Sequence, residues 1–305
     1  MSTSTPATEA DRTENRHHGR RVALIWFVLS VIATPLMFFW WGPHLPPGRM
    51  TTSAIGAQWS TRVLATFATP VMIFVWTMII YSMRVFRQRG DVIEDGPAIR
   101  GNMLVQTSWI TVTAAIVLFL AAFGTYELVT PAGAGAGEGP NPIWTPKGHN
   151  VLQVQVIGQQ WRWTYRYPQF GGMESTVLML PVDTPVQFNV TSLDVIHSFW
   201  AYKLGVKADA NPGVNNVAFT TALQTGTFIV RCSELCGLWH ADMFNNGAVT
   251  TTAAFDSWAS TYEAAHAATT KILPPYALTY TPDDLGADGG DYNLTENPIA
   301  PPKKS

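Results

Sequence analysis

The sequence predicts a membrane anchor of α-helices followed by an all-β sandwich or barrel. Charged residues make up 13% of the chain, against roughly 25% in ordinary globular domains. The deficit lies in the N-terminal half, where long apolar segments occur. The second half is instead a series of short runs rich in Val, Thr and aromatic residues, separated by Pro, Gly and Asp. One further run contains both cysteines of the chain and indicates a metal site.

Three segments are almost free of charge and long enough to cross a hydrocarbon core of about 30 Å, which takes about 20 helical residues. They are residues 22–42, 62–86 and 103–128. Pro35 is expected to kink the first of them. A cleaved signal peptide is a second interpretation of the first segment, because basic residues precede it. Its apolar run is longer than the roughly 7–15 residues of a signal peptide, which favours a retained helix.

The arginines predict the orientation of these helices, because short cytoplasmic loops are enriched in Lys and Arg. Three arginines precede the first segment: Arg16, Arg20 and Arg21. Four more lie near the connection between the second and third segments: Arg84, Arg87, Arg89 and Arg100. Residues 1–21 are therefore expected to form a cytoplasmic basic N-terminus, and loop 43–61 to lie outside. The same rule places everything after the third helix on the periplasmic or extracellular side of the cytoplasmic membrane of a bacterium.

The C-terminal half is expected to form one β domain over residues 145–262. A flexible linker, 131–144, precedes it and is rich in Gly and Pro. Strands are predicted for the runs 151–157, 175–180, 185–191, 216–222 and 226–231. A helical patch around 254–268 is expected to close the domain, and residues 263–305 are expected to be a mostly disordered tail.

Residues 232–243 read Cys-Ser-Glu-Leu-Cys-Gly-Leu-Trp-His-Ala-Asp-Met and contain the only two cysteines of the chain. Thiolate, thioether and imidazole ligands favour copper over the hard cations, which prefer oxygen. A mononuclear blue-copper site needs one Cys, so this chain has one cysteine too many. The second thiolate is explained if Cys232 and Cys236 both bridge two copper ions.

Each copper then needs a further strong ligand, and the loop supplies one of them, His240. The leading candidate for the other is His197, at the end of a strand-like segment. Met243 would be a weak axial ligand, with a backbone carbonyl near Glu234 serving the second ion. A disulfide is the common fate of an exported Cys pair, and structural zinc normally takes four Cys or His ligands. Neither alternative gives the methionine a role.

With these motifs the sequence resembles subunit II of the haem-copper oxidases of the cytochrome c oxidase type. The motifs are CSELCGLWHADM at 232–243, DVIHSFW at 194–200, LGVKADANPG at 204–213 and GQQWRWTY at 158–165. The resemblance implies a cupredoxin-like Greek-key sandwich or barrel with a dinuclear copper centre. It also implies an electron-entry subunit, which accepts electrons from a cytochrome c-type donor. Subunit I would then reduce oxygen to water and couple this to proton translocation.

The resemblance further implies the roles of individual residues. One copper would be held by His197, both cysteines and Met243, and the other by both cysteines, His240 and the Glu234 carbonyl. The Glu234 side chain would reach a magnesium ion shared with subunit I. Electron entry would use Trp161 and Trp163, and contact with subunit I would use Asp194 and Asp209. No catalytic residue is expected in this chain, and no nucleic acid partner.

The chain departs from the family at two places. Where many members have a Glu near the start of the last span, this chain has Gln106, which cannot ionise and so cannot feed protons to subunit I. Beside Trp161, where acidic residues often steer a basic cytochrome c, stand Arg162 and Arg166. Between residues 145 and 262 there are six basic and seven acidic residues, which leaves little field for steering. We therefore expect a less basic cytochrome c, or a membrane-bound cytochrome, as the donor.

Three other protein classes fit the sequence less well. A quinol oxidase subunit resembles this architecture but lacks the copper ligands. A copper carrier would bind one ion at an exposed, flexible site, which does not require three apolar segments. Nitrous oxide reductase shares the copper loop but needs a larger His-rich domain. A fused c-type haem is not expected, because no Cys-x-x-Cys-His motif occurs.

Overall fold

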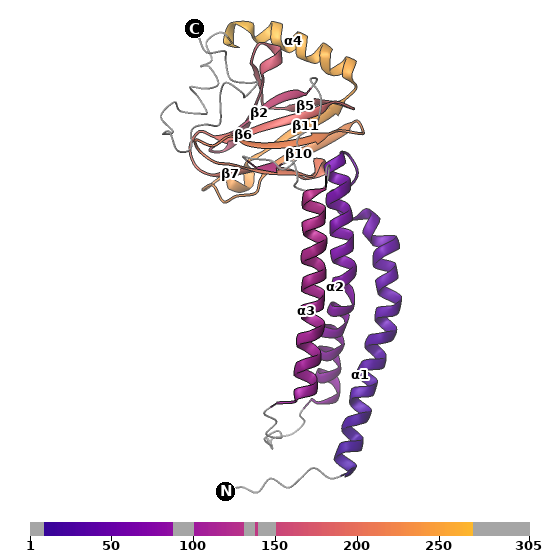
Figure 1. Cartoon of the computed structure of the whole chain (residues 1–305). Helices are drawn as coiled ribbons and strands as arrows, with labels where there is room; N and C mark the ends of the chain where they lie inside the picture. Colours follow the sequence, from indigo (N-terminus) through magenta and orange to yellow (C-terminus); the bar gives the residue numbers. More distant parts are fainter. Residues whose placement is uncertain (1–8, 88–100, 131–137, 140–150, 271–305) are drawn as a thin grey trace. The chain divides into compact units, whose positions relative to one another are not determined.

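The computed structural model describes residues 9–87, 101–130, 138–139 and 151–270 (Figure 1). Several features predicted from the sequence lie outside these residues: Arg89, Arg100, most of the linker and the tail after Thr270. Within the described chain, apolar helices precede a β sandwich, as expected. The predicted fold class is confirmed.

Three helices are long and apolar enough to cross a membrane, by length and composition. They are α1 (Glu9–Leu36), α2 (Thr52–Val85) and α3 (Met103–Val129). Short π and 3₁₀ turns, Met37–Trp41 and Gly42–His44, extend the first of them. α2 begins at Thr52 rather than at 62, so its first turns precede the predicted span.

Helices α1 and α2 are antiparallel neighbours joined by polar contacts along their length. Trp26 Nε1 donates to the Pro70 carbonyl at 2.9 Å, and Arg62 Nε donates to the Phe38 carbonyl at 2.7 Å. A third contact joins His18 Nδ1 to the Tyr81 hydroxyl at 2.7 Å. Because these groups would otherwise face hydrocarbon without a partner, the contacts favour this pairing of the helices.

The β domain is a sandwich of two sheets (Figure 1). The first sheet has the order β1-β9-β6-β2-β3-β4 and the second has the order β5-β11-β10-β7-β8. The strands are β1 (Glu138–Gly139), β2 (Leu152–Gln159), β3 (Arg162–Tyr167), β4 (Met173–Ser175), β5 (Leu178–Pro181), β6 (Pro185–Ser192), β7 (His197–Ala201), β8 (Val206–Ala210), β9 (Asn216–Thr221), β10 (Gly226–Cys232) and β11 (Phe244–Thr250). Neighbouring strands are mostly distant in sequence, as a Greek-key connectivity requires.

Two boundaries differ from the predictions. The run 175–180 is not one strand, because β4 belongs to the first sheet and β5 to the second. The chain changes sheet at Thr176, whose carbonyl accepts a hydrogen bond from Asn245 Nδ2 at 2.6 Å. Within the predicted linker, β1 pairs with β9.

The core lies between the sheets and is built from alternate residues of each strand. On β3 it takes Trp163, Tyr165 and Tyr167, all fully buried. Phe199 of β7 packs against Trp163 and Phe188, with ring centroids 5.8 and 5.3 Å away. Burial of such rings contributes about 1.5–3 kcal/mol each to folding.

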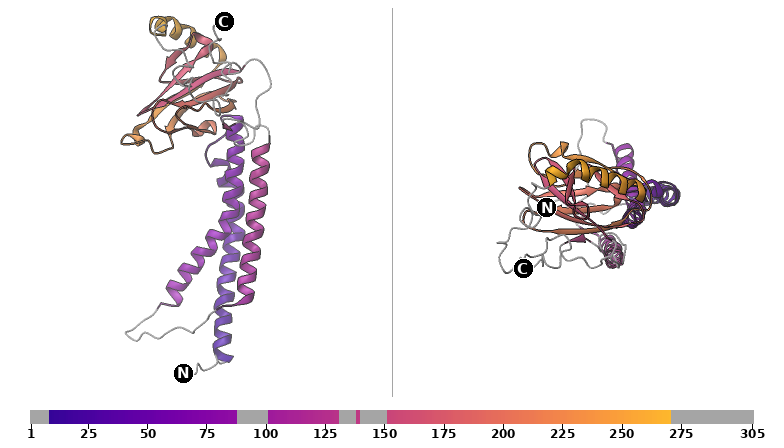
Figure 2. Two further views of the ribbon diagram at one scale, coloured as in Figure 1. Left: turned by 60° about the vertical axis from the view of Figure 1, so that its left-hand side comes forward. Right: turned by 90° about the horizontal axis from the view of Figure 1, so that it is seen from above.

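Helix α4 (Thr252–Thr270) lies over the edge strands β4 and β5 (Figures 1 and 2). Its Phe255 and Ala259 are buried, and Phe255 packs 6.2 Å from the Tyr167 ring. The helix confirms that a helical patch closes the domain. It continues through residues 263–270, so that part of the predicted tail is helical.

The start of α2 packs into the β domain. Thr51 caps the helix by accepting a hydrogen bond from Ala54 N at 2.9 Å, and its own hydroxyl donates to the Leu204 carbonyl. Gly205 lies against this turn with φ +64°, and a Cβ there would come within 2.5 Å of Ala54 N. A glycine at this position therefore permits both the left-handed conformation and the close approach.

We expect Gly205→Ala to lower the free energy of unfolding by about 2–4 kcal/mol, from backbone strain plus overpacking. Gly172→Ala is the matched control, because Gly172 also has positive φ, +78°, but a Cβ there would meet nothing within 4 Å. In that control the free energy of unfolding should fall only by the backbone strain, about 1–2 kcal/mol. Denaturant unfolding of the full chain in detergent measures both. Equal losses would show that the contact with Ala54 contributes nothing.

Candidate metal centre

The Cys-containing loop is closed at its base by two paired strands. Arg231 of β10 lies opposite Phe244 of β11, and Cys232 N donates to the Met243 carbonyl at 3.0 Å. The loop therefore leaves and re-enters the sheet at one place, which brings Cys232 and Met243 together. A 3₁₀ turn that begins at His240 shapes the second half of the loop.

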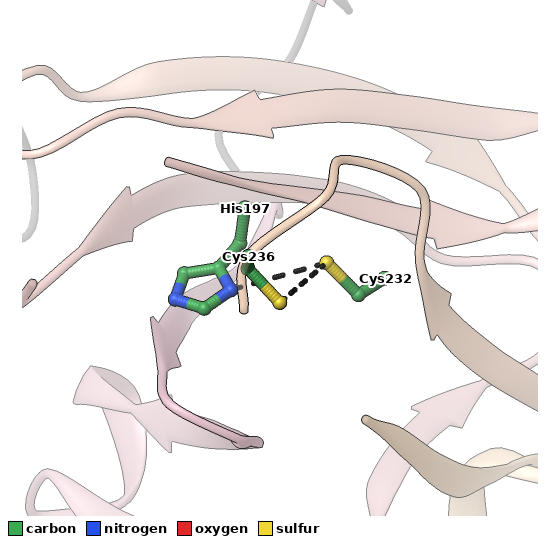
Figure 3. Close-up of side chains that lie close together, drawn as sticks. All are labelled: His197, Cys232 and Cys236. Carbon is green, nitrogen blue, oxygen red and sulfur yellow. Dashed lines mark hydrogen bonds between the residues drawn. The ribbon is translucent and has the colours of Figure 1, made fainter. Parts of the chain in front are cut away.

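His197 reaches the loop from the neighbouring strand. It is the first residue of β7, which pairs antiparallel with β10 so that Cys232 lies opposite Phe199. The His197 side chain is fully buried, and its Nδ1 lies 3.9 Å from Cys232 Sγ. Figure 3 shows its ring facing the two cysteines.

The two cysteines are free thiols. Their Sγ atoms lie 3.7 Å apart, well beyond the roughly 2.05 Å of a disulfide bond. Ligand atoms of His197, Cys232 and Cys236 all lie within 4.8 Å of one another, and all three residues are buried. The structure therefore brings together three of the predicted copper ligands.

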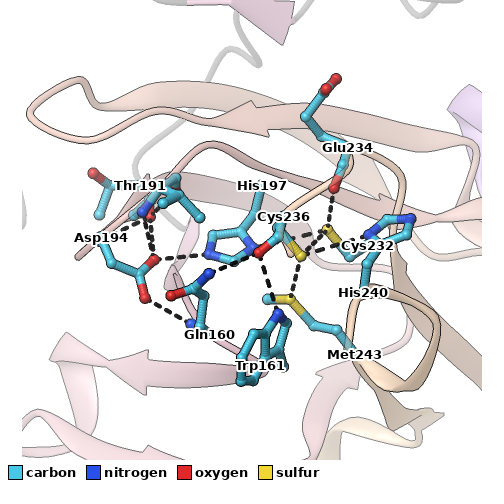
Figure 4. A network of polar contacts seen from close by, with 12 residues as sticks. Gln160, Trp161, Thr191, Asp194, His197, Cys232, Glu234, Cys236, His240 and Met243 are labelled. Atoms are coloured by element: carbon cyan, nitrogen blue, oxygen red, sulfur yellow. Dashed lines mark hydrogen bonds and ion pairs between the residues drawn. The ribbon is translucent and has the colours of Figure 1, made fainter. Parts of the chain in front are cut away.

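The remaining predicted ligands lie around the same sulfur atoms (Figure 4). His240 Nδ1 is 3.5 Å and Met243 Sδ is 3.8 Å from Cys236 Sγ. The Glu234 carbonyl oxygen is 3.2 Å from Cys232 Sγ, while its carboxylate points away from the cluster. All six predicted positions thus contribute an atom to one site.

The spacing of these atoms fits a copper centre. Two tetrahedral ligands bonded to one ion at about 2.0–2.3 Å stand roughly 3.5 Å apart. Contacts of 3.2–3.9 Å between the sulfurs and their neighbours match that value. The atoms are two thiols, two imidazole nitrogens, a thioether and a carbonyl, a set that suits copper better than magnesium or calcium.

Asp194 orients His197 from behind. Its Oδ1 lies 2.9 Å from His197 Nε2, and its Oδ2 accepts a hydrogen bond from Gln160 N at 2.7 Å. With a carboxylate as acceptor, Nε2 carries the hydrogen, so the Nδ1 lone pair faces the sulfurs. A hydrogen bond of this kind fixes the tautomer and the ring plane of a metal-binding histidine.

The Gln160–Trp161 turn contacts the loop at a single acceptor. Gln160 Nε2 and Trp161 Nε1 both donate to the Cys236 carbonyl, at 2.8 and 3.2 Å. Gly237 permits this approach, because a Cβ there would lie 3.0 Å from Gln160 Nε2 and 3.3 Å from Trp161 Cζ2. Trp161 is only partly buried, so its ring joins the surface to the cluster.

The two thiols have opposite pKa shifts. Burial raises the pKa of Cys232, but hydrogen bonding with His197 and with backbone groups of Ser198 and Glu234 outweighs it, and the pKa falls to about 6. Burial and the charge of Cys232 raise the pKa of Cys236 to about 12. Like charges this close cannot both form without a cation. The pair therefore favours a cation that neutralises both sulfurs.

Comparison with known proteins identifies the family. The family described as "Cytochrome C oxidase subunit II, periplasmic domain" matches residues 173–246. Cytochrome c oxidase subunit 2 of Synechocystis sp. is 28% identical over 300 residues, which cover 86% of this chain and 90% of that protein. The corresponding protein of Thermostichus vulcanus is also 28% identical, over 83% of this chain and 89% of its own length. The chain belongs to the cytochrome c oxidase subunit II family.

A solved relative covers the β domain of this subunit II. The periplasmic domain of subunit II of cytochrome oxidase (CoxB) of Bradyrhizobium japonicum is 34% identical, over 40% of this chain and 99% of that chain, with a TM-score of 0.38. The three apolar helices and the match to the family's periplasmic domain fit a membrane protein with a periplasmic domain. The residues matched by the family include the whole loop from Cys232 to Met243.

Two residues that the sequence placed beside the electron donor lie elsewhere. Trp163 is fully buried in the core, with its ring centroid 6.0 Å from that of His197, so it cannot contact a docked protein. Arg166 is also buried, with its side chain 6% exposed, and its Nε donates to Glu174 at 2.8 Å. The alternation of β3 directs Trp163 inward. The pairing of β3 with β4 places Arg166, on the opposite face of the sheet, beside Glu174. Arg162 and Trp161 alone remain at the surface.

Sequence reasoning missed the parts played by Gln160, Gly237 and Asp194 in this subunit II. Asp194 was placed at an interface, and its contact with His197 was not foreseen. The spacing of three residues between them was the available signal. No sequence signal pointed to Gln160 or Gly237, because the turn of Gln160 meets the copper loop only in the folded chain. Gln160 and its hydrogen-bond partner Cys236 are 76 residues apart in sequence.

Proposed function

We propose that the cluster holds two copper ions and makes this chain the electron-entry subunit of its oxidase. Electrons would arrive from a cytochrome c-type donor and pass to the haem-copper subunit I, which reduces oxygen to water and translocates protons. Copper held here would supply a carrier that accepts and releases one electron. The observation that carries the proposal is the pair of free thiols 3.7 Å apart, with a histidine nitrogen beside each.

The ligands would divide between two ions that share both sulfurs. His197 and Met243 would complete one ion, and His240 and the Glu234 carbonyl the other. A stiff framework supports this arrangement, because β10 and β11 clamp the loop and Asp194 holds His197. Little movement of the ligands on reduction lowers the barrier to electron transfer. The outward carboxylate of Glu234 would be free to bind magnesium shared with subunit I.

Trp161 would be the residue through which electrons enter. Its indole reaches the surface and donates a hydrogen bond to the carbonyl of Cys236, a proposed ligand. Trp163 would instead pack against the His197 ring in the core.

The donor would dock through contacts that depend little on charge. The copper loop presents Leu238 and Trp239, 81% and 53% exposed. Since Arg166 is paired with Glu174, Arg162 is the one surface arginine that flanks Trp161. A weakly basic cytochrome c or a membrane-bound cytochrome fits such a surface better than a strongly basic protein does.

Contact with subunit I would involve Asp194 and Asp209. Asp209 is half exposed and accepts a hydrogen bond from Ser198 Oγ at 2.7 Å, which joins it to the strand of His197. Gln106 lies in α3 and is exposed in this chain, yet it cannot carry a proton. Proton uptake would therefore use a Glu on another chain or a proton path of another type.

The proposal is tested by adding copper to the reduced full chain, purified in detergent. We expect two coppers per chain, a purple colour and an electron paramagnetic resonance signal from one electron shared by two ions. A stoichiometry of one, with a blue or colourless product, would contradict the proposal. The proposal would also be contradicted if zinc displaced the copper and bound with the same number of ions per chain.

Met243→Leu is expected to keep both coppers and to raise the reduction potential. The thioether is a weak donor, and its loss disfavours the more highly charged oxidised form. A shift of about 60 mV would correspond to a tenfold change in the equilibrium constant. Redox titration of the copper colour measures it, with Met173→Leu, a buried methionine of β4, as control. Loss of all copper in Met243→Leu would contradict an axial role.

A further inference from the structure

An apolar groove lies between α1 and α2, separate from the copper centre. Its volume is about 360 Å³, within the range of about 300–1,000 Å³ that small-molecule sites occupy. The lining residues are Ile25, Leu29, Ile73, Trp76, Thr77, Ile80, Tyr81, Arg84 and Val85. From Ile73 to Tyr81 the groove follows α2 for about 12 Å, at 1.5 Å per residue. This length and lining suit a hydrocarbon chain.

One end of the groove is polar and positively charged. Arg84 lines it, and the contact of 2.7 Å between His18 Nδ1 and the Tyr81 hydroxyl lies at the same end. Arg20 lies on α1 within one turn of that contact, and Arg87 lies two residues after the end of α2 at Val85. At the other end Trp26 bonds to the Pro70 carbonyl.

Arg84 forms no ion pair with any residue that the structure describes, and residues 17–87 contain no Asp or Glu. The nearest carboxylate before them on α1, Glu14, lies about one turn before His18. A guanidinium in such a stretch at the edge of a membrane favours an anion, and its planar donors bind phosphate in a bidentate manner. The arginines also mark this end of the helices as cytoplasmic. The inner leaflet, which is rich in anionic lipid, supplies such a phosphate.

We propose that the groove binds one anionic phospholipid, with an acyl chain along Leu29 and Ile73 and the phosphate at Arg84. The site requires α1, since Ile25 and Leu29 form one wall. It is independent of copper and of electron transfer. Its occupant joins α1 to α2 and would retain the first helix beside the second.

The test is native mass spectrometry of the full chain, 33.5 kDa, extracted into detergent with equal amounts of phosphatidylglycerol and phosphatidylcholine of matched acyl chains. We expect one retained phosphatidylglycerol per chain. Arg84→Gln should lower its retention about fivefold, the effect of one charge near a membrane surface. Leu29→Trp should fill the groove and abolish retention. Arg49→Gln, the same change in the loop before α2, should leave retention unaltered.

Several outcomes would overturn the proposal. They are equal retention of the two lipids, unchanged retention in Arg84→Gln, a mature mass that lacks α1, and displacement of the lipid by inorganic phosphate alone. Circular dichroism of each variant reports helix content. If Leu29→Trp loses helix, Ile73→Trp repeats the test from the opposite wall. Retention of lipid in a well-folded variant of either kind would also reject the site.

Discussion

Cys236→Ser is expected to abolish the dinuclear copper centre and with it the acceptance of electrons from a cytochrome. A serine hydroxyl stays protonated at neutral pH and cannot bridge two cations, whereas a thiolate can. The copper content should fall from two per chain to at most one. Metal analysis, the visible spectrum and electron paramagnetic resonance of the copper-loaded full chain measure the loss.

Cys232→Ser is the companion variant, and it should have the same effect. Both sulfurs are expected to bridge, and their separation of 3.7 Å makes them equivalent in this respect. A mononuclear site would respond differently, because one cysteine would be dispensable. Retention of two coppers in either variant would therefore reject a bridged centre. Ser233→Ala, a change in the same loop, is the control and should keep both coppers.

Trp161→Phe is expected to slow reduction by the cytochrome donor about tenfold or more while both coppers remain bound. Phenylalanine keeps the ring but loses the Nε1–H that bonds to the Cys236 carbonyl at 3.2 Å. A tenfold loss corresponds to about 1.4 kcal/mol in the barrier. Stopped-flow reduction at saturating donor measures the rate, so that weaker docking does not contribute.

Two further variants test whether the rate depends on the hydrogen bond of Trp161 or on the position of its indole. Trp239→Phe makes the same change on the exposed copper loop and should alter the rate less than twofold, because within the described residues no hydrogen bond joins its indole to a proposed ligand, unlike that of Trp161. Gly237→Ala leaves Trp161 intact but places a Cβ 3.3 Å from its ring, so it should slow reduction by displacing the indole. If Trp161→Phe and Trp239→Phe slow reduction equally, Trp161 has no special role. A direct chemical reductant should reduce all three variants at the normal rate.

The position of Arg166 shows where sequence reasoning about the donor was wrong. Its place in the sequence, five residues after Trp161, suggested a surface arginine. The register of β3 and β4 places it opposite Glu174, where the arginine side chain is buried against a partly exposed carboxylate. Whether a charged residue contributes to a surface field depends on its partner across the sheet. That partner is not its neighbour in sequence.

The strand run 175–180 shows a second limit. The run combines the strand formers Thr176 and Val177 with apolar residues, so the pattern predicts one strand. The chain changes sheets within it at Thr176, whose carbonyl accepts a hydrogen bond from Asn245 of β11. Local propensity cannot indicate which of two sheets a short strand joins.

By itself the sequence determined the helices that can cross a membrane, the β character of the second half and the chemistry of the loop from Cys232 to Met243. These features depend on residues within one segment, where composition and spacing are sufficient. The sequence also offered His197 as a partner of that loop, but only the tertiary structure decided that Asp194 orients it and that Trp161 rather than Trp163 reaches the surface. The burial of Trp163 and the place of His197 depend on the alternation of side chains across paired strands, and a shift of one residue in register would reverse both. Trp161 and Asp194 lie in turns beside those strands, and their contacts join segments distant in sequence.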